Sequence, residues 1–283
     1  TRRASRSWAG RRILQGRLCT GLQNMLRSNA LEAISLTTYS GKLSATDSIN
    51  IDDVIDSQVV LNPPANIPGR EGVPELVPHT QLRRRSMATV EGRATLIHAL
   101  AHIELNAINL GLDIVWRFPG MPDQFYRDWI RIAKEEAYHF RLLSEHLNEL
   151  GNSYGDFPAH NGLWEMAEKT RDDLLARLAL VPRTLEARGL DASVPIRDKL
   201  KQVGDAKAAA ILDIILRDEI GHVAVGNHWY KYLCSQRGLD PVSTYSMLAE
   251  QYGAPKLRGP FNLEARRAAG FDDAELAALQ MPG

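Results

Sequence analysis

Two short motifs constrain the fold of this chain more than any other feature. Glu136 and His139 lie three residues apart, and Glu219 and His222 repeat this spacing. Three residues make about one turn of an α-helix, so the carboxylate and the imidazole of each motif project from the same helical face. Each motif also lies in a long stretch with apolar residues at helical spacing. The pattern predicts two long helices that each direct an acid and an imidazole toward a common interior.

The rest of the chain predicts an all-α protein built on four long helices. We expect them over residues 89–116, 122–150, 162–188 with a kink at Pro182, and 205–237. A proline-rich arm at 61–80 precedes the helices, and shorter helices follow residue 238, the last opened by the capping box Asp272-x-x-Glu275. The predicted division is 1–85 for the N-terminal segment and arm, 86–238 for the bundle, and 239–283 for a helical extension.

Two further glutamates complete an internal repeat. Glu104 lies within the apolar stripe of the first long helix, 32 residues before Glu136, and Glu186 lies 33 residues before Glu219. Because antiparallel helices bring residues equidistant from their turn to the same depth, all six groups can converge. Gly189 could end the third helix early, so Glu168 is the first alternative to Glu186.

Helix bundles form dinuclear metal sites from this set of residues, with two Glu-x-x-His motifs and two single glutamates. Carboxylate and imidazole ligands suit iron or manganese. We therefore predict two iron ions, with manganese or a mixed iron–manganese pair as alternatives, bound by Glu104, Glu136, His139, Glu186, Glu219 and His222. His98 and His102, on another face of the first helix, are interpreted as satisfied or exposed histidines, with a surface metal as the alternative.

The same residues carry a resemblance to a known family. Ala-His-Ile-Glu104-Leu, Glu135-Glu136-Ala-Tyr-His139-Phe, Leu-Glu186-Ala-Arg-Gly and Asp218-Glu219-Ile-Gly-His222 resemble the ferritin-like proteins. Over most of residues 60–280 the chain is similar to a mainly bacterial ferritin-like family of unknown function. It resembles more distantly the ferritin-like tRNA hydroxylase that acts on methylthio-isopentenyl-adenosine. The resemblance implies a ferritin-like four-helix bundle with a metal site, and a second shell in which Asp218 holds His139 and Glu135 holds His222.

These features favour an O2-activating oxidoreductase or hydroxylase that acts on a small or nucleoside-like substrate. The electron donor is unknown. The alternatives are an iron-handling protein, by ferroxidase or storage action, and a non-catalytic interaction module stabilised by metal. We expect a substrate pocket lined by Tyr138, Trp129, His146 and Gly221.

The amino-acid composition indicates which classes of partner and which cellular compartment to expect. The 34 basic and 34 acidic residues balance, so charge does not favour nucleic acid as a bulk partner. No apolar run is long enough for a membrane span. A homodimer is possible, and the sequence does not decide the oligomeric state. The two cysteines, Cys19 and Cys234, fit a cytoplasmic location and leave no basis for an iron–sulfur cluster. Residues 1–31 hold seven arginines and no acid, which makes an organelle transit peptide the alternative.

Overall fold

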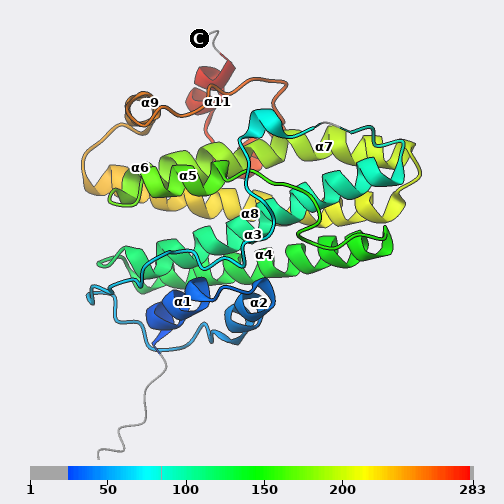
Figure 1. Cartoon of the computed structure of the whole chain (residues 1–283). Helices are drawn as coiled ribbons and strands as arrows, with labels where there is room; N and C mark the ends of the chain where they lie inside the picture. Colours follow the sequence, from blue (N-terminus) through cyan, green and yellow to red (C-terminus); the bar gives the residue numbers. More distant parts are fainter. Residues whose placement is uncertain (1–24, 84, 281–283) are drawn as a thin grey trace, which may run out of the picture.

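A computed structural model describes residues 25–83 and 85–280 (Figure 1). This part of the chain is helical, and its only β-pairings are isolated bridges. The elements are α1 (Leu26–Ser35), α2 (Tyr39–Ser48), the 3-10 turn η1 (His79–Gln81), α3 (Val90–Arg117), α4 (Asp123–Glu149), α5 (Gly162–Lys169), α6 (Leu174–Leu180), the π-helical turn η2 (Val181–Glu186), α7 (Ala187–Gln202), α8 (Ala206–Gln236), α9 (Pro241–Gln251), α10 (Leu263–Ala268) and α11 (Asp273–Gln280).

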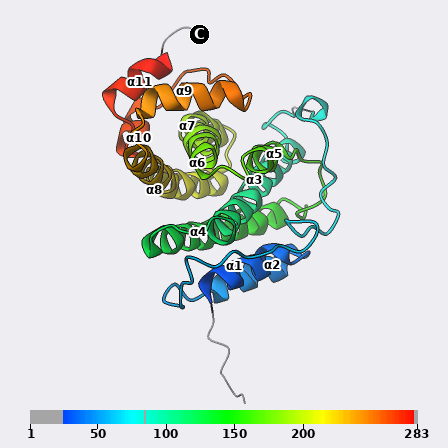
Figure 2. The same ribbon diagram turned by 90° about the vertical axis from the view of Figure 1, so that its left-hand side faces the viewer.

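The centre of the molecule is a helical bundle viewed nearly end-on in Figure 2. Helix α3 packs along α4, and α7 packs along α8, while α4 and α8 join the two pairs. Sequence chemistry sets the helix starts: the Thr89 side chain accepts the Gly92 N–H at 3.0 Å, and Asp205 accepts the Ala208 N–H at 3.0 Å. Three of the four long helices therefore run within one or two residues of the predicted bounds.

The third predicted helix is the exception, because it is three elements instead of one. Helix α5 ends at Lys169, α6 follows, and the kink expected at Pro182 takes the form of the π-helical turn η2. Gly189 does not end the helix, since α7 continues through it to Gln202. The π turn also fits α8: a Cβ at Gly226 would lie 2.6 Å from the Cβ of Pro182, so a glycine is required at this contact.

Segments on both sides enclose the bundle. Helices α1 and α2 lie against α3 and α4, and α9–α11 lie beyond α7 and α8 (Figure 2). Arg27, counted above in a basic leader, is only 2 % exposed and donates to the carbonyls of Val115 and Trp116. It therefore belongs to the folded body, and the rest of that leader, residues 1–24, lies outside the described residues.

The proline-rich arm wraps the bundle. The Gly69 N–H donates to the Ile34 carbonyl at 2.9 Å, and the Val77 N–H donates to the Ala159 carbonyl at 2.8 Å. The arm thereby links α1 to the loop that follows α4. The predicted capping box is present, since Asp272 and Glu275 each accept the other's backbone N–H. Among the described helices, none is long and apolar enough to cross a membrane.

Candidate metal centre

Five of the six predicted ligand residues form two clusters in the bundle interior. Ligand atoms of Glu104, Glu136 and His139 lie within 4.8 Å of one another, and the same holds for Glu136, Glu219 and His222. All five residues are buried, none more than 8 % exposed. We call these five residues and Glu186 the carboxylate centre. Glu136 belongs to both groups and therefore connects the two halves of the sequence repeat.

The two imidazoles turn the same nitrogen toward the acids. His139 Nδ1 lies 3.1 Å from Glu136 Oε2 and 3.5 Å from Glu104 Oε2. His222 Nδ1 lies 2.9 Å from Glu136 Oε1 and 3.9 Å from Glu219 Oε1. The two oxygens of Glu136 thus face different histidines, as a carboxylate between two metal positions would.

The opposite nitrogens contact the two acids proposed for the second shell. His139 Nε2 lies 3.1 Å from Asp218 Oδ2, and His222 Nε2 lies 2.7 Å from Glu135 Oε2. A carboxylate at Nε2 fixes the proton there and leaves Nδ1 free to act as a ligand. Both contacts cross from α4 to α8 and have the pairing expected from sequence. Whether they tune a metal stays a prediction.

Glu186 reaches the centre from the last residue of the π turn. Its Oε2 is buried and has no hydrogen-bond partner among the described residues. Burial raises the pKa of Glu186 well above its usual range, and the nearby Glu219 and Glu136 raise it further. Glu168, the alternative, is exposed and bonds to Arg171 at 2.9 Å on the surface. The structure thus brings Glu186, and not Glu168, to the interior.

The electrostatics of the centre follow from crowding of acids in a dry interior. Burial, together with Glu136, raises the pKa of Glu104 and of Glu219. Burial opposes protonation of His139, but hydrogen bonds to Glu104 and Glu136 outweigh it and raise the pKa to about 11. The pKa of His222 is likewise raised, against burial, by Glu136 and Glu135. Without metal, the site therefore holds protons where cations would otherwise balance the charge.

The unsatisfied atoms test whether metals fit this set. Glu104 Oε2, Glu186 Oε2, Glu219 Oε2 and His222 Nδ1 are all buried, and none of them makes a well-directed hydrogen bond in the described chain. Glu104 Oε2 lies near His139, and His222 Nδ1 lies near Glu136, but neither contact has hydrogen-bond geometry. Buried polar atoms normally have partners, and leaving them unpaired is costly. These four atoms come from three helical segments, and Glu136 is a neighbour of all four residues. Oxygen-rich ligands with two imidazoles match iron or manganese, so the residues fit a dinuclear metal site.

Two of the four residues predicted to line a substrate pocket lie on the surface of the bundle. Tyr138 is 45 % exposed, and a Cβ at Gly221 would meet nothing within 4 Å. Each lies one or two residues from a ligand, which places it on the outer face of its helix, because successive residues turn by about 100°. Neither therefore encloses space beside the carboxylates.

The other two members are buried but engaged in packing. Trp129 is 2 % exposed and packs beside Phe125 in the core, where its carbonyl closely approaches Gly111. His146 bonds through Nε2 to Asp205, at the far end of α4. It therefore links α4 to the start of α8 and is not directed at the carboxylate centre.

Sequence reasoning missed a second group of polar residues on another face of α3. His98 and His102 are buried and not on the surface, and each is bonded at one nitrogen: His98 Nε2 accepts the Gly155 N–H, and His102 Nδ1 lies 2.7 Å from the Tyr154 hydroxyl. The other nitrogen of each ring has no hydrogen-bond partner among the described residues. Nearby, Lys42 and Arg70 come from segments in which no motif indicates a function. The π turn that positions Glu186 was also missed, although Pro182 marked its place.

Comparison with known proteins gives a family without an assigned activity. The family described as Protein of unknown function (DUF455) matches residues 28–277. An uncharacterized protein of Haemophilus influenzae is 50 % identical over 245 residues, which cover 84 % of this chain and 84 % of that protein. No solved structure matches the chain.

Proposed function

The chain belongs to the family described as Protein of unknown function (DUF455), and we propose that it is a ferritin-like protein with a dinuclear metal centre. Two iron ions are the favoured cofactor, and manganese or a mixed pair is the alternative. The proposed activity is O2-dependent oxidation of a small or nucleoside-like organic substrate, with electrons from an external donor. This proposal rests on the chemistry of the carboxylate centre.

One observation carries the proposal: the two oxygens of Glu136 face the Nδ1 atoms of two different histidines. Each of these histidines is held at its Nε2 by an acid from the opposite helix. Glu104, Glu186 and Glu219 each have a buried oxygen without a hydrogen bond in the described chain. Such oxygens are costly in a cluster that serves only packing. Two divalent cations would satisfy these oxygens and neutralise four carboxylates.

Bound iron or manganese would supply the redox chemistry that O2 activation requires. The protein residues have separate tasks. Glu104, Glu136 and His139 would hold one metal, and Glu136, Glu219 and His222, together with Glu186, would hold the other. Asp218 and Glu135 would keep the Nε2 protons in place and fix the orientation of both rings. The apolar core around these helices excludes water and strengthens every charge interaction within.

The alternative is iron handling by ferroxidase or storage action. Helices α1 and α2 cover α3 and α4, and α9–α11 lie beyond α7 and α8. A storage shell needs bundle faces that are free to assemble. The covered faces support an enzyme or a specific complex over a shell subunit.

The test is metal analysis followed by reaction with O2. The protein is purified after growth with iron or manganese, and metal per chain is measured by mass spectrometry. We expect about two metal ions per chain. The reduced iron form should consume O2 in proportion to its metal content, and excess ferrous iron should not accumulate as mineral.

A matched pair of variants identifies the site. Glu136→Gln should lose metal and O2 consumption, whereas Glu145→Gln, an exposed glutamate on the same helix, should keep both. Mineral growth on loading would make this an iron-storage protein. Metal binding that survives the Glu136 substitution unchanged would place the metals elsewhere.

A further inference from the structure

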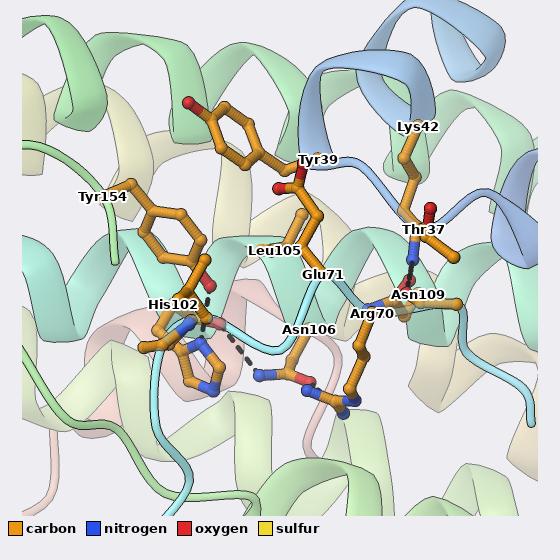
Figure 3. A pocket seen from close by; sticks show the side chains of 13 residues that line it. Thr37, Tyr39, Lys42, Arg70, Glu71, His102, Leu105, Asn106, Asn109 and Tyr154 are labelled. Carbon is orange, nitrogen blue, oxygen red and sulfur yellow. Dashed lines mark hydrogen bonds between the residues drawn. The ribbon is translucent and has the colours of Figure 1, made fainter. Parts of the chain in front are cut away.

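A small polar cavity lies on the side of α3 that faces α2 and the arm (Figure 3). It forms where α2, the arm at 69–74, the middle of α3 and the loop after α4 meet. Its volume is about 30 Å³. We call it the cationic pocket, and its lining residues include Lys42, Arg70, Glu71, Asn106, Asn109 and Tyr154.

Lys42 is buried, and it has no acid partner among the residues that the structure describes. The residue is only 2 % exposed. Its Nζ donates to the Gly69 carbonyl at 3.0 Å and to Asn109 Oδ1 at 2.6 Å. Both acceptors are neutral. Burial, and next the charge of Arg70, lower the pKa of Lys42 to about 7. A buried ammonium paired only with neutral groups is costly, so the site favours an anion.

Arg70 repeats this arrangement from the arm. Its Nη2 donates to Asn161 Oδ1 at 2.8 Å and lies 3.5 Å from Asn106 Oδ1, and again both acceptors are neutral amides. Within residues 25–83 and 85–280, neither Arg70 nor Lys42 forms an ion pair with a carboxylate. Two positively charged side chains therefore line one cavity, and neither is paired with an acid in the part of the chain that the structure describes.

The acidic groups near the cavity do not supply that charge. Glu71 is the one carboxylate among the lining residues, but it is exposed, and its side chain points away from that of Arg70 (Figure 3). Burial raises the pKa of the Tyr154 hydroxyl, which stays protonated and can donate to His102 Nδ1. The pocket thus keeps its positive excess.

We propose that the cationic pocket binds a small oxyanion, either a carboxylate or a phosphate group, between Lys42 and Arg70. A cavity of about 30 Å³ has room for only a few atoms, so the carboxylate or the outer oxygens of the phosphate would enter it, and a nucleotide or a large ring would not. Lysine and arginine are the usual partners of such groups, with charge-assisted hydrogen bonds. The anion would join α2, the arm and α3.

This site is separate from the carboxylate centre and does not depend on the proposed metals. Both use α3, but Glu104 faces His139 of α4, whereas Asn106 and Asn109 face the arm and α2. Binding of an anion should therefore persist in a protein that has lost its metal.

The experiment is calorimetric titration of the purified full chain with inorganic phosphate and, separately, with acetate. It is done at about pH 6, where Lys42 carries its proton, and at constant ionic strength. The variants are Lys42→Met and Arg70→Gln, with Lys169→Gln as the control, because Lys169 is exposed and does not line the pocket. We expect saturable binding of one anion per chain, weakened at least about tenfold in both pocket variants and unchanged in the control.

The comparison of the two anions separates the sources, since tighter phosphate binding indicates a phosphate group and tighter acetate binding a carboxylate. No saturable binding of either anion would overturn the proposal, as would equal affinity in all variants. Binding lost in Glu136→Gln but kept in both pocket variants would assign the anion to the metals instead. If Lys42→Met does not fold, Arg70→Gln decides alone, because Arg70 lies nearer the surface.

Discussion

The two faces of α3 bury charge of opposite sign. Toward α4 and α8, Glu104 joins three other glutamates, and two histidines balance only part of their charge. Toward α2 and the arm, Asn106 and Asn109 meet Arg70 and Lys42 with no balancing acid in the described chain. One helix therefore borders an acidic centre that suits cations and a basic pocket that suits anions.

Both regions are buried, so burial alone does not indicate which kind of ligand each would bind. The sign of the side-chain charge that lacks a partner indicates it: cations for the carboxylate centre and anions for the cationic pocket. In the carboxylate centre, protons held by His139 and His222 substitute for cations. In the cationic pocket, Lys42 responds in the opposite way, by a lowered pKa. In each region, gain or loss of protons lowers the free-energy cost of burying charge. A bound counter-ion would lower the same cost without the change in protonation.

The largest effect should come from Glu136→Gln, which removes the residue shared by both halves of the centre. Each of its oxygens faces one histidine, so a neutral amide there weakens both metal positions. Metal content should fall from about two ions per chain to about one or fewer. Phosphate titration of the same variant should match the original protein. A parallel loss of anion binding would contradict the separation of the two regions.

The carboxylate centre could be predicted because its residues repeat at helical spacing on long, regular segments. Glu-x-x-His on α4 and α8 fixes direction and depth, and Asp218 and Glu135, each directly before a ligand residue, reach the opposite helix. The π turn could not be predicted, since Pro182 indicates a kink but not its form. That form depends on the contact with Gly226, 44 residues later in the chain.

The cationic pocket could not be predicted for a different reason. Lys42 lies in a segment with weak periodicity, and Arg70 lies in an arm whose path is set by contacts with α1 and with Ala159. No spacing rule relates these two residues to Asn109 or Asn161. Their convergence is a product of tertiary packing, so only the three-dimensional structure brings the two charges together.

Metal removal should reveal the sign of the charge at the carboxylate centre. In the metal-free fold, Glu104, Glu186 and Glu219 have raised pKa values, and His139 and His222 do too, so the native state holds protons that the unfolded chain releases. Stability should therefore fall as pH rises from about 5 to 8.

The measurement is urea unfolding of chelated and metal-loaded protein across this pH range. The metal-loaded form should show a weaker slope, because the cations displace these protons and bind only the native state. Equal slopes with and without metal would indicate that the cations do not occupy the carboxylate centre.

Lys42 should give a slope of the opposite sign. Its folded pKa is about 7, below the ordinary 10.5, so above pH 7 the native state loses a proton that the unfolded chain keeps. The stability of the original protein relative to Lys42→Met should rise by about 2–3 kcal/mol between pH 7 and 9. Metal-loaded protein is used for both, so that the carboxylate centre contributes equally.

Added phosphate refines this measurement. An anion beside Lys42 stabilises its charged form and raises its pKa, so saturating phosphate should flatten the pH-dependent difference between the two proteins. A difference that is the same at pH 7 and 9 without phosphate would show that Lys42 remains charged in the fold. That result would remove the contrast with the carboxylate centre.

The smallest expected effect separates the two acids that hold the histidines. Asp218 is 19 % exposed at its side chain and Glu135 is 41 % exposed, so water competes more strongly for the contact of Glu135 with His222. We expect Asp218→Asn to weaken metal binding by about 10–100-fold and Glu135→Gln to stay near the lower limit of that range. Competition with a coloured chelator measures both affinities on metal-loaded protein. The Glu135 contact is the shorter, 2.7 Å against 3.1 Å, and a larger loss in Glu135→Gln would mean that distance outweighs burial at these positions. No loss in either variant would reduce both acids to surface charges and leave the ring orientation to packing alone.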